Sequence, residues 1–285
     1  MSAVLLACLS ALLFGAMSVG LRIGLQRRPD VPTATVATVV SAFVVALVLA
    51  AAEAPFRNVH LRHAWPFALA GMLSPGLAQI FVTLAVRDVG ASRSSVVLGS
   101  APLVAVTIAL IFLGEPASAP LLIGAVLIVA GGVELARERD RPEHLLSVGL
   151  LFAFVAVVLF SIRDNVLRWL AVGSNVPPGV AAAAALGGGA AVSVAVMGPR
   201  LRGRGLWDAL PYVPVGFFFG TSYVALFEAY YRGRVTVVSP LIATESLWGV
   251  VLSVLLLRES EVVGRRLVVG AALIVAGGAL IGAYR

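Results

Sequence analysis

Lysine is absent from this 285-residue chain, and charged residues of any kind are few. They make up 12% of the sequence against 60% hydrophobic residues, and the mean hydropathy is +1.02. A soluble domain has about 25% charged residues, so the composition excludes an ordinary water-soluble protein. Cysteine occurs once, as Cys8, which excludes a disulfide scaffold. The high apolar content also excludes intrinsic disorder.

The basic residues are 21 arginines, and they give the chain a formal net charge of +7. Most of them lie between apolar runs, as Arg57 and Arg62 do. Arginines in such places are typical of the boundary between membrane and water. The sequence contains no continuous basic stripe or tail, so we expect no nucleic-acid partner.

Apolar runs occupy most of the chain, and each approaches the ~20 residues that span a bilayer. The ten expected helices cover residues 2–25, 33–53, 64–86, 92–113, 118–136, 145–170, 177–197, 207–231, 235–257 and 262–283. Turn-forming residues such as Pro29 and Gly114 lie in the short connections. The sequence therefore predicts an all-α membrane protein with ten transmembrane helices, embedded in a lipid bilayer.

One nine-residue segment occurs twice. Residues 124–132 read GAVLIVAGG and residues 270–278 read GAALIVAGG, so eight of nine positions are identical. Glu115 and Glu259 close the preceding apolar runs at nearly the same spacing. These matches predict a duplication, with one five-helix repeat in residues 1–140 and the other in 141–285. Because five is odd, the second repeat enters the membrane from the opposite side, which makes the two halves inverted repeats.

The segment from Ser94 to Pro116, followed by residues 124–132, resembles the EamA repeat of the drug/metabolite transporter superfamily. Residues 12–20, LLFGAMSVG, resemble the opening helix of that repeat. With the second copy, the resemblance covers nearly the whole chain. It implies ten helices and the export or exchange of small metabolites, in a multi-pass protein of the bacterial plasma membrane.

Glu245 lies near the middle of an expected span, where an ionised side chain costs on the order of 3 kcal/mol or more. Trp248 follows three residues later on the same helical face. We expect the carboxylate and the indole to hold a cationic group of a substrate, or the carboxylate to carry a coupling proton. The alternative is a structural pair between Glu245 and an arginine of another helix.

Five further polar residues are candidates for substrate contact or coupling. They are Ser18, Arg22, Gln79, Arg163 and Tyr223. For Arg22 the alternative is a side chain that extends to the membrane surface. For Arg163 the alternative is a polar cluster near the surface, in which Asp164 pairs with Arg168 four residues on.

Four prolines, Pro75, Pro102, Pro214 and Pro240, fall inside expected spans. Proline removes a backbone hydrogen bond and kinks a helix. The freed carbonyls need partners from protein or from a watery cavity. Pro102 and Pro240 occupy comparable helices of the two repeats, so we expect the cavity beside these helices.

Enzyme chemistry has little support, because His60, His63 and His144 all lie in expected loops and no phosphate-binding loop is present. We expect no catalytic residues, no cofactor and no metal site. The sequence predicts a secondary transporter that exports small metabolites, amino acids or amphipathic amines by alternating access. The alternative is a lipid-flipping or lipid-processing membrane protein. Arginine bias places both termini outside the cell, whereas the resemblance implies cytoplasmic termini.

Overall fold

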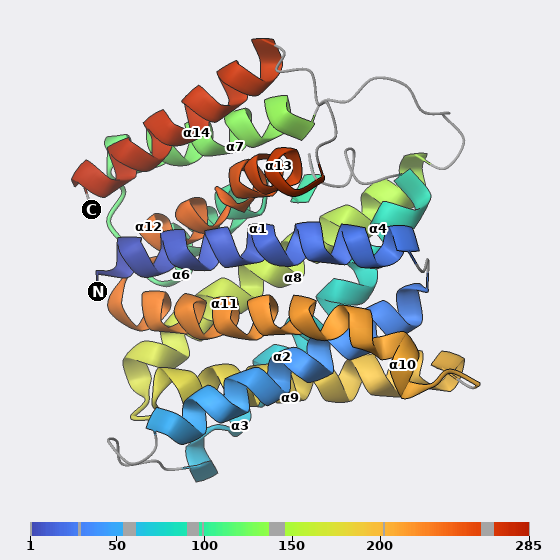
Figure 1. Cartoon of the computed structure of the whole chain (residues 1–285). Coiled ribbons are helices and arrows are strands. Elements are labelled where there is room, and N and C mark those ends of the chain that lie inside the picture. Colours follow the sequence, from blue (N-terminus) through green and yellow to red (C-terminus); the bar gives the residue numbers. More distant parts are fainter. Residues whose placement is uncertain are drawn as a thin grey trace.

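The structure, a computed structural model, describes residues 2–27, 30–53, 61–89, 97–98, 100–136, 146–201, 203–257 and 265–284. The regular elements in these ranges are helical (Figure 1). They are α1 (Ala3–Arg27), α2 (Val31–Glu53), η2 (Leu61–His63), α3 (Trp65–Gly71), η3 (Met72–Leu77), α4 (Ala78–Val89), α6 (Ala101–Phe112), α7 (Ala119–Ala136), α8 (Leu146–Gly173), α9 (Pro178–Met197), η4 (Gly198–Leu201), α10 (Leu206–Ala209), η5 (Leu210–Tyr212), α11 (Val213–Arg232), α12 (Val235–Ile242), α13 (Glu245–Leu257) and α14 (Arg265–Tyr284).

In the described part of the chain, six helical segments are long and apolar enough to cross a membrane. They are Ala3–Leu25, Val31–Glu53, Trp65–Val82, Val148–Gly173, Pro178–Leu201 and Trp207–Arg232. Three shorter apolar helices are Ala101–Phe112, Ala119–Glu134 and Val269–Ile281. The span expected over residues 235–257 is divided between α12 and α13. Over the residues that the structure describes, the all-helical class is confirmed, and six clear spans stand where ten are expected.

Large apolar side chains lie on the outside of the bundle. Phe112 is 78% exposed and Trp207 is 80% exposed. Extensive apolar surface of this kind is rare on soluble monomers. Such a surface is expected on a helix bundle that hydrocarbon surrounds, in agreement with the apolar spans.

The repeated nine-residue segment forms a helix pair at one edge of the bundle, where α7 packs against α14 (Figure 1). A Cβ atom on Gly131 would lie 2.6 Å from the carbonyl oxygen of Gly270, and one on Gly277 would lie 2.6 Å from the carbonyl oxygen of Gly124. The start of one copy therefore meets the end of the other, so the pair is antiparallel. We call these contacts the glycine seam. The absence of side chains at these positions is what lets the backbones approach so closely.

The most extensive of the other packing pairs follow the same exchange of halves. α2 packs against α9, its counterpart in the second half. The pair α1 with α11 is matched by α8 with α4, and the pair α1 with α13 by α8 with α6. Likewise α11 packs against α2, and α3 against α9. If each of the first five expected helices is replaced by its counterpart among the last five, and the reverse, every one of these pairs becomes another pair of the set or itself.

The prolines differ in what they do to their helices. Pro75 lies in the π-helical segment η3, where Ser74 has non-helical backbone angles of φ −148° and ψ 117°. Pro240 lies inside α12, and residues 243–244 form a turn before α13 begins. Pro102 and Pro214 lie in the first turn of α6 and of α11, where each helix begins. Backbone N–H groups have no helical acceptor there, so proline costs nothing.

Candidate functional site

A buried ion pair lies in α8 in the interior of the bundle. The Nε and Nη2 atoms of Arg163 lie 2.9 Å and 2.8 Å from Oδ1 of Asp164. The two residues are only 8% and 7% exposed. Their charges are stable in such a place only because each neutralises the other and both are hydrogen-bonded.

Tyr223 of α11 links this ion pair to the broken helix. Its hydroxyl accepts a hydrogen bond of 2.8 Å from Nη1 of Arg163 and donates one of 3.2 Å to the carbonyl oxygen of Ser74. The N–H of Ala78, which a regular helix would direct to Ser74, bonds to Leu73 and Pro75 instead. Tyr223 therefore satisfies a carbonyl group that the break in η3 leaves without its helical partner.

The aromatic surroundings add to the stability of the guanidinium group. Its central carbon lies 5.4 Å from the ring centroid of Phe160 and 5.5 Å from that of Tyr223. At these distances both rings attract the cation through their π faces. Arg163 is thus held by a carboxylate, a hydroxyl and two rings.

Asp164 also contacts α12 of the same half. Its Oδ2 accepts a hydrogen bond of 3.1 Å from the hydroxyl of Ser239. The hydroxyl of Tyr230 is buried and has no hydrogen-bond partner among the described residues. The carboxylate thereby connects α8 with the segment that precedes the break before α13.

Asn165 fastens α8 to α6. Its side-chain nitrogen donates to the carbonyl oxygens of Ala105 at 3.0 Å and Ser161 at 2.9 Å. The hydroxyl of Ser161 reaches the carbonyl oxygen of Ala101 at 3.0 Å. These bonds bring the first turn of α6 against the polar side of α8, beside the ion pair.

Glu245 is the first residue of α13 and is half-buried. It follows Ser239, which bonds to an acidic residue of α8, across the turn at residues 243–244. With both carboxyl groups ionised, Arg163, Asp164 and Glu245 together carry one excess negative charge. We call Arg163, Asp164, Tyr223, Ser239 and Glu245 the charged cluster.

The candidate site residues predicted from the sequence lie in different parts of the structure. Arg163, Tyr223 and Glu245 belong to the charged cluster. Trp248 is half-buried in α13 and packs against α1, where a Cβ atom added to Gly15 would lie 2.8 Å from the Cβ of Trp248. Ser18 is exposed on α1, and Gln79 is half-buried in α4 just beyond η3. The side chain of Arg22 lies outside the described part of the structure.

The alternative in which Asp164 pairs with Arg168 is wrong. Nη1 of Arg168 donates instead to the carbonyl oxygen of Tyr230 at 2.8 Å, near the C-terminal end of α11. A cation is favoured there because the last carbonyls of a helix lack intrahelical partners. Asp164 is left to Arg163, its neighbour in sequence.

Sequence reasoning missed Glu115 as a structural residue. Its two carboxylate oxygens accept hydrogen bonds of 2.8 Å and 2.9 Å from the backbone N–H groups of Val235 and Thr236. Glu115 of the first half thus caps the N-terminus of α12 in the second half. The one signal in the sequence is the matched glutamate at Glu259. Ser239 and Tyr230 carry no signal that separates them from other polar residues.

The family model of the EamA-like transporter family matches residues 1–134 and, separately, residues 147–283. A crystal structure of another protein is similar over 99% of this chain and 96% of its own, with a TM-score of 0.79 at 20% identity, which shows a shared fold. No curated protein matches the chain in sequence. Since the two matches cover nearly the whole chain and the structure has the apolar helices of a multi-pass membrane protein, the chain belongs to the EamA-like transporter family.

Proposed function

We propose that the protein is a secondary transporter that exports small metabolites, amino acids or amphipathic amines by alternating access. Its family consists of membrane transporters, and its six clear spans make it an integral multi-pass membrane protein. The proposed arrangement has ten spans in two inverted repeats, residues 1–140 and 141–285, in a bacterial plasma membrane. The shorter apolar helices and the pair α12 and α13 supply the four remaining spans.

The glycine seam supports the inverted relation of the two halves. α7 and α14 carry the same nine-residue segment and pack antiparallel, with equivalent glycines in equivalent contacts. Two equivalent helices that run in opposite directions are related by an axis across the bundle, not along it. Inverted repeats place a substrate site near the midplane between them and permit each side to open in turn.

The observation that carries the proposal is the charged cluster in the interior of a bundle of membrane helices. Ionisable residues there are costly and mark substrate or proton pathways. The cluster has one excess negative charge when its carboxyl groups are ionised, which favours a cationic group or a proton. Asp164 is committed to Arg163 at 2.8 Å, so Glu245 is the carboxyl group we assign to substrate or proton binding, with Trp248 one turn away on α13.

The burial of the cluster supports a soluble substrate over a lipid. Arg163 and Asp164 are nine-tenths buried. A protein that flips lipids needs a polar lining that opens sideways to the bilayer, and the packing of α6, α11 and α12 around these residues is not of that kind. A small polar molecule enclosed between the halves fits this arrangement.

The proposal is tested with purified protein in liposomes and the substitution Glu245→Gln. A panel of amino acids and amines is first screened by the shift in unfolding temperature, and flux of the hits is then driven by a pH gradient. We expect at least about a tenfold loss of gradient-driven flux in the variant, the effect of removing one charge-assisted contact. The pH dependence of exchange should flatten as well.

The matched control is Glu228→Gln. Glu228 also lies in a membrane helix, but it pairs with the exposed Arg232 at 2.6 Å, near the end of α11. This variant should transport like the unsubstituted protein. Unchanged flux and unchanged pH dependence in Glu245→Gln would remove Glu245 from the mechanism.

A further inference from the structure

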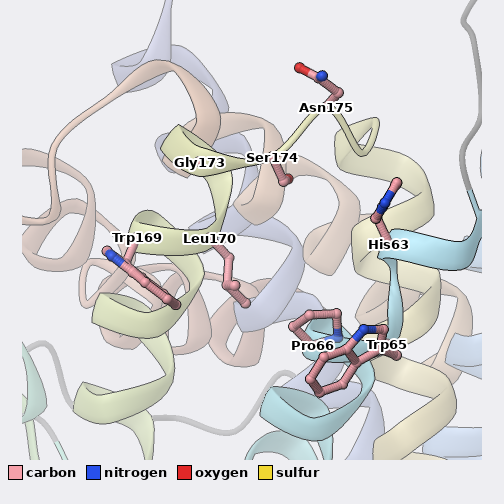
Figure 2. Close-up of a pocket in the computed structure, with 8 residues that line it drawn as sticks. All are labelled: His63, Trp65, Pro66, Trp169, Leu170, Gly173, Ser174 and Asn175. Carbon is pink, nitrogen blue, oxygen red and sulfur yellow. The ribbon is translucent and has the colours of Figure 1, made fainter.

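A groove of about 560 Å³ lies between the start of α3 and the end of α8 (Figure 2). None of the residues that line it belongs to the charged cluster. Figure 2 shows its two chemical ends. His63, Ser174 and Asn175 lie toward one end, and Trp65, Trp169 and Leu170 lie toward the other. The groove is therefore amphipathic along its length.

The groove lies at the level where membrane meets water. Trp65 is the first residue of one candidate span, and Gly173 is the last residue of another. The polar lining residues lie just beyond these limits, His63 before α3 and Asn175 after α8. The apolar end thus faces the hydrocarbon and the polar end faces the headgroup region.

The two tryptophans are open to the surroundings. Trp65 is 63% exposed and Trp169 is 68% exposed. Indole rings favour this level of the membrane because one edge is polar and the remainder apolar. Between them the groove offers an apolar slot whose polar end continues into His63, Ser174 and Asn175.

Arg62 does not line the groove, but it brings a positive charge next to His63, a lining residue at the polar end. It precedes His63 in the short helix η2 and is exposed. No acidic residue lines the groove among the described residues. Basic residues between membrane helices at this level attract anionic lipid headgroups. We propose that the groove binds one anionic phospholipid, with its phosphate at Arg62 and His63 and an acyl chain along Trp65 and Trp169.

Such a lipid would contact the two helical segments that bracket the charged cluster. α8 carries Arg163, and α3 continues into η3, whose Ser74 accepts the hydrogen bond from Tyr223. The lipid therefore contacts the outer surface of α8 and α3, and Tyr223 connects α8 with η3 in the interior of the bundle.

The test uses single-tryptophan proteins in nanodiscs of phosphatidylcholine with rising fractions of acyl-brominated phosphatidylglycerol. Bromine quenches indole fluorescence on contact. Trp207 is the matched reference, because it is also exposed at the start of a candidate span but is not among the residues that line the groove. We expect quenching of Trp169 to saturate at low fractions of the anionic lipid, while quenching of Trp207 rises in proportion to its amount.

The headgroup contact is tested in the Trp169 protein by combining Arg62→Gln with His63→Gln. The fraction of anionic lipid at half-maximal quenching should increase by about fivefold or more, the effect of losing one basic contact near the surface. Trp207 with the same two substitutions should behave as before. Equal, proportional quenching of Trp169 and Trp207 would overturn the proposal, as would a curve for Trp169 that the two substitutions leave unchanged. Saturation with brominated phosphatidylcholine at the same low fraction would also overturn it.

Discussion

Arg163 connects two helices in the interior of the bundle. Its guanidinium group bonds to Asp164 on its own helix and to Tyr223 on α11, and it lies against two aromatic rings. Removing one member of a buried ion pair leaves the other charge uncompensated, whereas removing both charges relieves that cost. The two substitutions are therefore expected to be strongly non-additive.

Arg163→Gln and Asp164→Asn should each lower the free energy of unfolding by about 3–5 kcal/mol. The double variant should lose much less than the sum of the two, because no unpaired charge remains. Unfolding by denaturing detergent in mixed micelles measures all three. As a control, Arg232→Gln removes half of the exposed pair with Glu228 and should cost less than about 1 kcal/mol. Additive losses in the double variant would contradict the tight coupling.

At the scale of elements, side chains from other helices and loops bind the backbone on both sides of the connection from α11 to α12. Arg168 binds the carbonyl of Tyr230 near the end of α11, and Glu115 binds the first N–H groups of α12. Each side chain complements the partial charge of the helix terminus that it meets. Because Glu115 precedes α7, it also ties the first half of the chain to the second.

Glu115→Gln should loosen the first turn of α12 while leaving the fold intact. The amide retains a hydrogen-bond acceptor but loses the negative charge and one of the two acceptor oxygens, at a cost of about 1 kcal/mol. Hydrogen exchange at Val235 and Thr236 should therefore accelerate by about fivefold. The N–H of Ala181, bonded to Pro177 at the start of α9, provides an internal control and should not change. Unchanged exchange at Val235 and Thr236, or equal acceleration at all three amides, would contradict capping by Glu115.

At the scale of the whole molecule, the helices could be predicted and their partners could not. Apolar length and turn residues locate a helix closely, as residues 118–136 and α7 show, because they are local properties. Arg168 bonds to a carbonyl oxygen near the end of α11, which leaves Asp164 to pair with Arg163. That choice depends on the tertiary packing of α8 against α11, which the sequence does not show. The break before α13 and the contact between Tyr223 and Ser74 are likewise settled by neighbouring helices.

The repeat is the feature for which sequence and packing agree most directly, and it leads to a prediction about both halves. The copies meet through the glycine seam, with a Cβ on Gly131 directed at Gly270 and one on Gly277 directed at Gly124. In both cases the nearest atom is a backbone carbonyl oxygen at 2.6 Å, which cannot move aside as a flexible side chain can. Substitutions at the two positions should therefore have the same effect.

Gly131→Ala and Gly277→Ala should each lower the free energy of unfolding by about 1–3 kcal/mol, as overpacking does elsewhere. Gly249 in α13 is the control, because a Cβ there meets no described atom within 4 Å. Gly249→Ala should be neutral or stabilise the helix by up to about 1 kcal/mol, since alanine favours helix more than glycine. The three variants are compared by thermal unfolding in the same detergent. If Gly131→Ala destabilises and Gly277→Ala does not, the halves are not joined by equivalent contacts, and the inverted relation loses its main structural support.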